Sequence, residues 1–352
     1  MISRQAGSRV AADRDPIVVL AADDRFAMPL ATTVRSALDN LAADAKLQIY
    51  VLDGGIKERT KDRLLRSWPA GRFRIEWLRV DASVLAGAPV SGHVNLVSYY
   101  RILIPRLLPG DIRRVIYLDS DLIVCADLAR LWEHELSGQL CLAVQDCAAP
   151  YVDSTQALAN YQLCGPHIGC VQPIPNFREI GLNPKAAYFN AGVLLIDLAG
   201  WRSADVPEQM LACLAQHKQH VRWWDQYALN VVLSGRWGRL DARWNQGSHI
   251  FQYPTWEQSP YNRQSYEQQR DDPYIVHFTT RHKPWRASCQ HPFRQKFFEY
   301  VDRTAWAGWR LPRLRVFLEL MKTPERRFRH GRKWLLDQAQ QWLQPSRQRS
   351  AS

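Results

Sequence analysis

Two aspartates stand one residue apart where an apolar segment of this sequence ends. Asp119 and Asp121 flank Ser120 and follow Arg114–Leu118, a short run typical of a buried strand. In extended backbone, residues two apart project to the same side, so the two carboxylates would repel each other unless a cation lay between them. Asp-Ser-Asp also suits an ordinary turn, so the spacing alone leaves a metal site and a solvated turn open.

A histidine and a lysine follow a later strand-like run. His277 stands near the end of Tyr274–Phe278, and Lys283 comes six residues further on. An imidazole that joins two carboxylates gives a mixed nitrogen and oxygen site, which suits Mn²⁺ better than Mg²⁺ or Ca²⁺; Mg²⁺ is the alternative. Lys283 would then supply a positive charge for a phosphate. On its own, however, His277 also fits a core histidine with an ordinary hydrogen bond.

Polar residues occur at two other strand ends. Asp23 and Asp24 follow the first apolar run, Ile17–Ala22, where a carboxylate can accept hydrogen bonds from a base or a ribose. Helix N-capping is equally open for Asp24. Asn190 is followed by two small residues and a strand-like run, and small residues let a ligand approach the backbone closely. An ordinary turn before a strand is the alternative for Asn190.

The elements that must position these residues alternate in type along the chain. The strand-like runs are Ile17–Ala22, Leu47–Leu52, Phe73–Val80, Arg114–Leu118, Cys141–Gln145, Val193–Leu198 and Tyr274–Phe278. The segments with helical spacing are Pro29–Leu41, Lys57–Trp68, Tyr99–Leu108, Asp205–His220 and Asp225–Leu233. This alternation predicts an α/β fold with βαβ units and one mostly parallel sheet that contains all seven runs. Ligands of such sheets bind beyond the carboxyl ends of the strands, where the candidate residues stand.

Two long stretches lack periodicity. Residues 147–187 are rich in Pro, Gly, Asn and Gln, and loops of this length in compact domains are usually lids or binding loops. Residues 252–272 are polar with interspersed Tyr and Trp, and we expect them to form a surface excursion.

Length and composition predict a globular enzyme or binding protein. The 352 residues are 46% hydrophobic, which is enough to bury a core and too much for a disordered chain. We expect a mobile leader over residues 1–14 and one catalytic domain over residues 15–300. No stretch approaches the ~20 apolar residues of a membrane span, and Ile17–Ala22 is too short for a signal-peptide core, so we predict a cytoplasmic protein. The seven scattered cysteines form no CxxC pair and are expected to be reduced.

Positive charge is concentrated in residues 301–352. Twelve Lys and Arg stand there against four Asp and Glu, in a chain whose net charge is +12. Basic side chains mixed with Trp, Phe and Leu suit a helical tail on an anionic lipid surface, here the inner face of the cytoplasmic membrane. A solvated tail is the alternative. A nucleic-acid-binding protein would need the charge across a folded face, so we expect no nucleic-acid partner.

Together, and in this order, the motifs resemble glycosyltransferase family 8, which contains bacterial lipopolysaccharide galactosyl- and glucosyltransferases, glycogenin and galactinol synthase. The motifs are AADD at 21–24, YYR at 99–101, YLDSD at 117–121, FNAG at 189–192, DQ at 225–226 and HFTTRHKPW at 277–285. The resemblance covers about residues 16 to 300. It implies a GT-A type, Rossmann-like fold. It also implies that a hexose, galactose or glucose, passes from a UDP-hexose donor to a hydroxyl of a glycan or lipid-linked, lipopolysaccharide-type acceptor, with retention of configuration.

The resemblance also implies roles for individual residues. Family members hold Mn²⁺ on the donor diphosphate with positions that match Asp119, Asp121 and His277. The donor-binding positions match Asp23, Asp24, Arg101, Asn190 and Lys283, and the positions around the transferred hexose match Asp146, Asp225 and Gln226. The segment Trp244-Asn245-Gln246 would reach the acceptor side. The chain departs from the family at Thr280, where members often have Gly, which puts backbone contacts from this loop to the phosphates in doubt.

Two other classes of protein were weighed. A nucleotide-binding dehydrogenase begins with a similar βαβ unit, but Ala21–Arg25 lacks the GxGxxG that binds a pyrophosphate. A catalytically inactive GT-A scaffold would share the fold. Against it stand the intact Asp119, Asp121, His277 and Lys283.

Overall fold

The computed structural model describes residues 15–88, 96–312 and 316. The predicted leader and all but residues 301–312 and 316 of the predicted tail lie outside the described residues, so the structure leaves both expectations untested. Among the residues that it describes, no helix is long and apolar enough to span a membrane.

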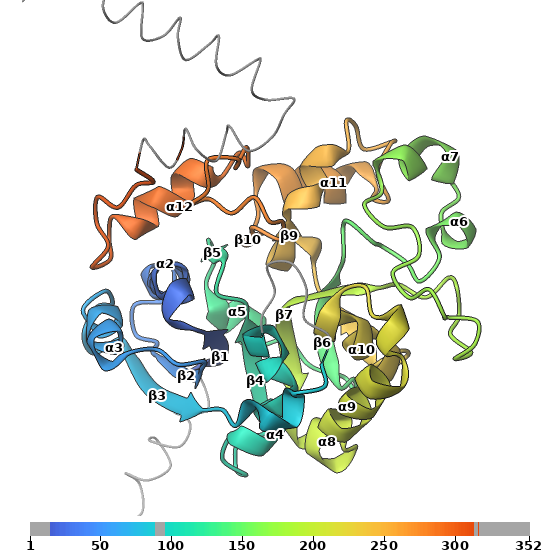
Figure 1. Ribbon diagram of the computed structural model, residues 1–352. Helices are drawn as coiled ribbons and strands as arrows, with labels where there is room; N and C mark the ends of the chain where they lie inside the picture. Colours follow the sequence, from blue (N-terminus) through green and yellow to red (C-terminus); the bar gives the residue numbers. More distant parts are fainter. Residues whose placement is uncertain (1–14, 89–95, 313–315, 317–352) are drawn as a thin grey trace, which may run out of the picture.

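A seven-stranded sheet forms the centre of the protein (Figure 1), with the strand order β3-β2-β1-β4-β7-β6-β8. Its strands are β1 (Ile17–Ala22), β2 (Leu47–Asp53), β3 (Phe73–Arg79), β4 (Arg114–Leu118), β6 (Cys141–Gln145), β7 (Phe189–Asp197) and β8 (Trp237–Arg239). Strand β7 runs antiparallel to both of its neighbours, whereas all other neighbouring pairs are parallel. The prediction of an α/β fold with a mostly parallel sheet is therefore confirmed.

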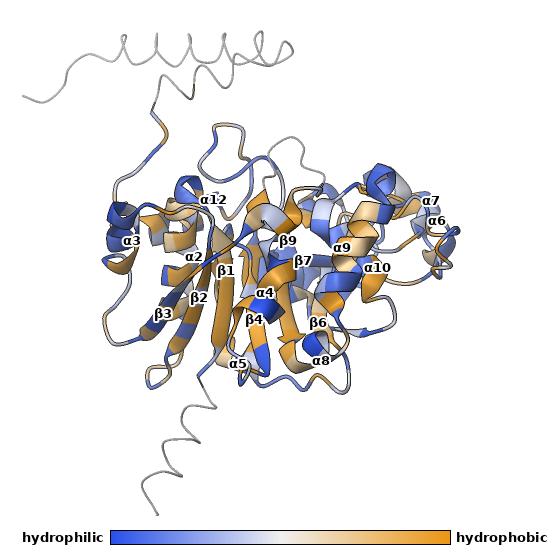
Figure 2. Ribbon diagram, turned by 60° about the horizontal axis from the view of Figure 1, so that its bottom comes forward, coloured by the Kyte–Doolittle hydropathy of each residue, from blue (hydrophilic) through white to orange (hydrophobic). Residues whose placement is uncertain are grey.

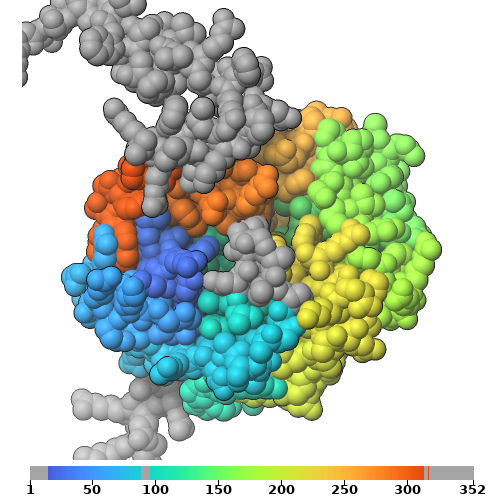
Figure 3. Space-filling view, in the orientation of Figure 1, coloured from blue at the N-terminus to red at the C-terminus, as the bar shows by residue number. Residues whose placement is uncertain are grey.

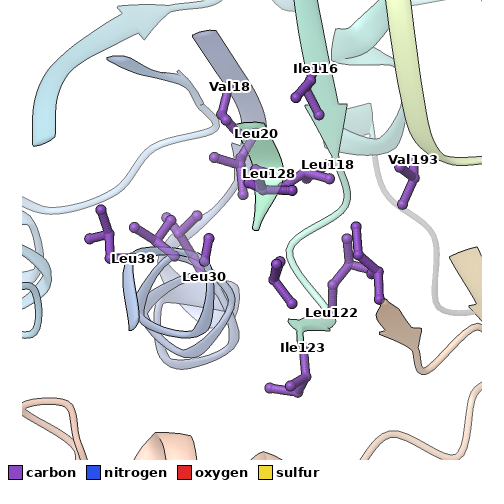
Figure 4. Packing of buried hydrophobic residues seen from close by; sticks show 14 of the residues in the cluster. Val18, Leu20, Leu30, Leu38, Ile116, Leu118, Leu122, Ile123, Leu128 and Val193 are labelled. Atoms are coloured by element: carbon purple, nitrogen blue, oxygen red, sulfur yellow. The ribbon is translucent and has the colours of Figure 1, made fainter. Parts of the chain in front are cut away.

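Helices cover both faces of this sheet. The α-helices of the described residues, not all of which contact this sheet, are α2 (Ala27–Asp39), α3 (Glu58–Leu65), α4 (Ile104–Leu107), α5 (Leu128–Trp132), α6 (Ser154–Ala157), α7 (Tyr161–Cys164), α8 (Leu198–Ser203), α9 (Val206–Gln216), α10 (Trp224–Val232), α11 (Arg263–Asp271) and α12 (Arg294–Val301). Side chains alternate between the faces: Val18 and Leu20 pack toward α2, and Val19 packs toward α8 and α9. Figure 4 shows Leu30 and Leu38 of α2 on the first of these faces.

The strands are apolar on both sides because both faces are covered. Figure 2 shows hydrophobic residues gathered along β1, β2 and β4, with hydrophilic residues on the outer surfaces of the helices. All residues of β1 except Ile17 are buried, and so are all residues of β4 except Arg114. Continuous apolar runs in the sequence therefore marked these strands correctly.

A second, smaller sheet corrects one prediction. Strands β5 (Leu122–Val124), β10 (Ile275–His277) and β9 (Gln246–Gly247) form it in the order β5-β10-β9. Tyr274–Phe278 was expected in the main sheet and is instead centred on β10 of this second sheet. A three-residue strand carries too few side chains to specify its partner. Because β10 is antiparallel to β5, His277 lies opposite Leu122, directly beside Asp121.

Two further segments differ from their predictions. The expected helix at Tyr99–Leu108 is mostly a 3₁₀ helix, η3 (Leu96–Leu103), followed by the single turn α4. The expected surface excursion at 252–272 contains α11 and contributes to a small core. Tyr253 and Tyr266 are buried there, and their hydroxyls donate to backbone oxygens at 2.6 and 2.7 Å. A polar segment can bury tyrosines when their hydroxyls find such partners.

The described part of the predicted tail packs against the body of the protein. Val301 and Trp306 are buried. Arg63 of α3 donates two hydrogen bonds, of 2.9 and 3.1 Å, to the carbonyl oxygen of Ala305. Residues 301–312 therefore belong to the same body as α2, α3 and α12.

Helix α2 holds the second sheet through one side-chain hydroxyl, which allows a test of the fold. Thr33 donates to the carbonyl oxygen of Leu122 at 2.9 Å, and its oxygen accepts from the amide of Leu122 at 3.2 Å. Thr33→Val leaves both buried groups unpaired, so we expect the free energy of unfolding to fall by about 1–3 kcal/mol. Urea unfolding followed by circular dichroism measures this change.

Thr32→Val on the same helix is the matched control. The hydroxyl of Thr32 donates only to the carbonyl oxygen of Met28, which the helix already pairs. The control should lose less than half as much stability. Equal losses in the two variants would contradict the role given to Thr33.

Candidate functional site

A cavity of about 520 Å³ opens where β1, β4 and β6 end and β7 begins. Ten of the eleven residues expected at the metal, the donor and the hexose line it: Asp23, Arg101, Asp119, Asp121, Asp146, Asn190, Asp225, Gln226, His277 and Lys283. Figure 3 shows that the segments supplying them, near the N-terminus (blue), around residue 220 (yellow) and around residue 290 (orange), meet on one face. The strand ends thus bring together residues that are far apart in the sequence.

Asp24 is the residue that the structure does not bring into this cavity. Its carboxylate accepts from the backbone amide of Lys57 at 3.2 Å and lies 3.8 Å from the Lys57 ammonium group. Asp23 lines the cavity and also caps the 3₁₀ helix η1 (Asp24–Phe26), whose amides at Arg25 and Phe26 it accepts at 3.0 Å. The capping role weighed for Asp24 therefore belongs to Asp23, and a donor contact by Asp24 is not supported.

Asp119, Asp121 and His277 form a cluster that could hold a metal ion. One ligand atom from each lies within 4.8 Å of the other two. Nε2 of His277 is 3.3 Å from Oδ1 of Asp121 and 3.6 Å from Oδ2 of Asp119. Gly192 is needed for this convergence, because a Cβ atom there would come within 3.0 Å of both the His277 ring and the Asp119 carboxylate. One imidazole and two carboxylates fit a divalent ion such as Mn²⁺ or Mg²⁺.

Asn245 fixes the orientation of the histidine ring. Its Oδ1 lies 2.8 Å from Nδ1 of His277, and its amide nitrogen donates to Oδ1 of Asn190 at 2.9 Å. Nδ1 therefore carries the proton, and the lone pair of Nε2 faces the aspartates, as a metal ligand requires. Asn245 is buried and supports His277, and the structure does not place it in the lining of the cavity, so the expected contact with the acceptor gains no support.

Lys283 joins the cluster from the loop after β10. Its ammonium group contacts the Asp121 carboxylate and donates to the carbonyl oxygen of Phe278 at 2.6 Å. Burial would raise the pKa of Asp121, but the charge of Lys283 and the neighbouring His277 outweigh it and hold that pKa well below its usual range. Asp121 is therefore ionised at neutral pH.

Arg101 bridges two carboxylates deep in the cavity wall. Its Nη2 donates to Oδ1 of Asp119 at 2.9 Å, and its Nε lies 2.7 Å from Oδ2 of Asp225. The hydroxyl of Tyr117 donates to the same Oδ1 of Asp119 at 3.0 Å. Because Oδ1 has two donors, Oδ2 of Asp119 is the oxygen that faces His277.

Asp146 organises the opposite wall. Its Oδ2 accepts hydrogen bonds of 2.9 Å from the side-chain amides of Asn190 and Gln226, and its Oδ1 accepts from the backbone of Ala148 at 2.7 Å. The oxygen of the Gln226 amide accepts from the backbone of Ala191 at 3.0 Å. Both ends of the Gln226 amide are therefore held, and its position in the cavity is fixed.

Trp223, Trp224 and His249 are among the cavity residues that the sequence reasoning missed. Trp223 and Trp224 stand directly before Asp225, and Trp224 has φ 47°, a strained value for a bulky side chain. His249 lines the cavity from a segment that shows no periodicity. The Trp-Trp pair beside the candidate Asp225 was a usable signal, because ligand pockets are lined mostly by hydrophobic and aromatic side chains around a few polar groups. Nothing in the sequence marked His249.

Comparisons with known proteins agree with this geometry. A family model described as Glycosyl transferase family 8 matches residues 17–289. General stress protein A of Bacillus subtilis (strain 168) is 31% identical over 292 residues, which cover 82% of this chain and 94% of the relative. The lipopolysaccharide 1,2-glucosyltransferase of Escherichia coli (strain K12) is 22% identical over 261 residues, 74% of this chain and 70% of that protein.

Solved structures show the same fold. The crystal structure of the galactosyltransferase LgtC with donor and acceptor sugar analogs superimposes with a TM-score of 0.68 at 24% identity. The match covers 82% of this chain and 96% of LgtC. The predicted GT-A type fold is therefore confirmed.

The buried Asp225 should make stability depend on pH. Burial raises its pKa from 3.8 to about 6, although Arg101 acts in the other direction. The folded state thus binds this proton more tightly than the unfolded state, and the free energy of unfolding falls as the pH rises between these two values. Asp225→Asn removes this titrating group. The free energy of unfolding of the variant minus that of wild type should therefore be about 2–3 kcal/mol larger at about pH 7 than at about pH 4.

Urea unfolding in metal-free buffer at the two pH values gives this difference. Asp44→Asn is the matched control, because it makes the same exchange at an exposed aspartate outside the cavity. A difference in stability between Asp225→Asn and wild type that is the same at both pH values would contradict the raised pKa.

Proposed function

Because the chain belongs to glycosyltransferase family 8, we propose that it transfers a hexose, galactose or glucose, from a UDP-sugar to a hydroxyl group of a glycan or lipopolysaccharide-type acceptor. One observation carries this proposal: the convergence of Asp119, Asp121, His277 and Lys283 in one cavity at the strand ends. Nitrogen and carboxylate ligands beside a lysine suit a metal-bound diphosphate.

We assign Mn²⁺, with Mg²⁺ as the alternative, to Asp119, Asp121 and His277. Such an ion would supply Lewis-acid charge to the departing diphosphate. Lys283 and Arg101 would add positive charge on the protein side of the same group. Asp23, at the end of β1, would accept hydrogen bonds from the uracil or ribose.

The hexose would lie against the wall formed by Asn190, Asp146, Asp225 and Gln226. Gln226 is held at both ends of its amide, so it can meet the anomeric carbon from a fixed position. Asp146 accepts three hydrogen bonds, and Asp225 is paired with Arg101. Carboxylates engaged in this way are poor nucleophiles. We therefore propose that configuration is retained by attack of the acceptor from the leaving-group face, without a covalent intermediate.

The acceptor and the place of action form the last part of the proposal. The printed name of the Escherichia coli relative includes lipopolysaccharide, which supports a lipid-linked glycan as acceptor. The enzyme would act in the cytoplasm at the inner face of the membrane, which residues 313–352 would contact through their basic and aromatic side chains. Nucleic acid is not among the proposed partners.

The metal and donor assignment is tested with Asp121→Asn. Loss of one ligand charge should weaken binding of UDP in the presence of Mn²⁺ at least tenfold. Substitution of a residue that only supports a metal ligand already lowers metal affinity or activity about 10–100-fold, and in this assignment Asp121 is itself a ligand. Isothermal titration calorimetry with UDP, with Mn²⁺ or with EDTA, measures this. The wild-type protein should bind UDP tightly only with the metal.

Asp44→Asn again serves as the control, and thermal unfolding checks that Asp121→Asn is folded. Metal-dependent UDP binding that is unchanged in Asp121→Asn would refute the assignment. With the UDP-hexose that proves active, NMR of the product should show the anomeric configuration of the donor. A glycosyl group found on Asp225 by mass spectrometry would contradict the proposed route to retention.

The membrane contact is tested with a chain that ends at Pro312. This end point keeps Trp306 and the packing of Ala305 on α3. The shortened protein should lose sedimentation with vesicles that contain phosphatidylglycerol, and should keep hydrolysis of the UDP-sugar at the wild-type rate. Unchanged sedimentation with these vesicles would count against the proposed role of residues 313–352.

A further inference from the structure

A second cavity, of about 460 Å³, lies on the outer side of η1. Three arginines and three tryptophans line it, and we call it the Arg–Trp cavity: Arg25, Arg59, Arg63, Trp285, Trp306 and Trp309. They come from η1, from α3 and from the segments before and after α12. Residues so distant in sequence gave no motif that could reveal this cavity.

The Arg–Trp cavity carries an excess of positive charge. Among residues 15–88, 96–312 and 316, the side chains of Arg25 and Arg59 form no hydrogen bond or ion pair, and both residues are exposed. Arg63 uses Nε and Nη2 on the carbonyl oxygen of Ala305 and lies 4.2 Å from the ring centre of Trp306. The one acidic residue in the lining, Asp24, is already paired with Lys57.

Two of the tryptophan rings pack against other aromatic residues, and Arg63 lies over the third, Trp306. Trp285 packs edge-on against Phe26 with ring centres 5.8 Å apart. Trp309 stacks on Phe298 at 6.5 Å with an interplanar angle of 16°. Fixed rings offer flat apolar surface to the carbon atoms of a ligand, and the arginines offer planar donors that match phosphate oxygens.

The two cavities are lined by neighbouring residues of the chain but do not share a lining residue. Asp23 and Phe26 line the first, whereas Asp24 and Arg25 line the second. The donor site therefore does not account for the second set of arginines.

We propose that the Arg–Trp cavity binds the phosphate of a small headgroup. Its arginines would hold the phosphate oxygens, and its tryptophans would cover the attached glycerol or sugar. The same chemistry occurs in an anionic lipid headgroup and in a soluble glycerol or sugar phosphate. This inference does not depend on the UDP-sugar reaction.

Arg25→Gln/Arg59→Gln in the full chain tests the proposal. The control Arg66→Gln/Arg74→Gln removes the same charge from exposed arginines outside the cavity. Calorimetry with glycerol 1-phosphate, and sedimentation with vesicles of phosphatidylcholine with or without phosphatidylglycerol, provide two arms. The Arg25/Arg59 variant should bind at least about tenfold more weakly in one arm, and the control should match wild type.

The two arms identify the source of the phosphate. An effect with glycerol 1-phosphate supports a soluble ligand, and an effect with vesicles alone supports a lipid headgroup. If both double variants bound the probe equally weakly, the loss would reflect the net charge of the protein and not the cavity, and the proposal would be overturned. So would the lack of any binding by wild type, or displacement of glycerol 1-phosphate by UDP, which would assign it to the catalytic cavity. UDP binding with Mn²⁺ should be unchanged in both variants, so the two proposals can fail separately.

Discussion

The structure depends on the balance of charge among three carboxylates that meet below one cavity. Asp119, Asp121 and Asp225 would repel one another if they were not compensated, and Asp121 and Asp225 are buried. Two cations lie among them: Arg101 bridges Asp119 and Asp225, and Lys283 contacts Asp121. Three negative charges face two positive charges, so one negative charge of the cluster is not compensated. A divalent cation between Asp119, Asp121 and His277 is the kind of ligand that such a cluster favours.

Each of the two sheets supplies residues of this cluster. Strand β4 of the main sheet ends at Leu118, directly before Asp119, and β5 of the second sheet begins directly after Asp121. The turn between the sheets therefore carries both aspartates. The antiparallel pairing of β5 with β10 then sets His277 beside them. Gly192, at the start of β7, leaves the space that the ring and the carboxylate occupy. Few substitutions at these positions would keep all four parts in place.

The sequence predicted which residues meet in the cavity better than it predicted the residues that support them. Asp119, Asp121, His277 and Lys283 could be found because they stand at or just after strand ends and match motifs of a known family. Their buried supports could not be found in this way. Asn245 was assigned to the acceptor, since a motif gives no orientation for a side chain. Asp23 and Asp24 are chemically equal, and the local turn alone decides which of them faces the cavity.

The fold shows the same division. The main strands were predictable because both of their faces are buried, which leaves long apolar runs in the sequence. The second sheet has strands of two or three residues, and their pairing depends on contacts with α2 rather than on their own side chains. The 3₁₀ helix at 96–103 has the apolar content of an α-helix, so hydropathy alone could not distinguish the two. Prediction failed where tertiary contacts determine the local structure.

Two residues of the wall that would face the sugar, Trp224 and Asp225, adopt unfavourable states in the folded protein. Asn230 fixes the helix that carries them. Trp224 adopts a strained backbone angle, and Asp225 is buried with a pKa raised to about 6; strain of this kind costs about 1–3 kcal/mol. Asn230 ties this part of α10 to β7: its side chain pairs with the amide and the carbonyl of Phe189 at 2.8 and 2.9 Å, and donates to the carbonyl oxygen of Gln226 at 2.9 Å. The start of α10 is thus held against the start of β7. Strained backbone persists where the surrounding structure fixes the chain, and these three hydrogen bonds of Asn230 fix the start of α10 beside the cavity.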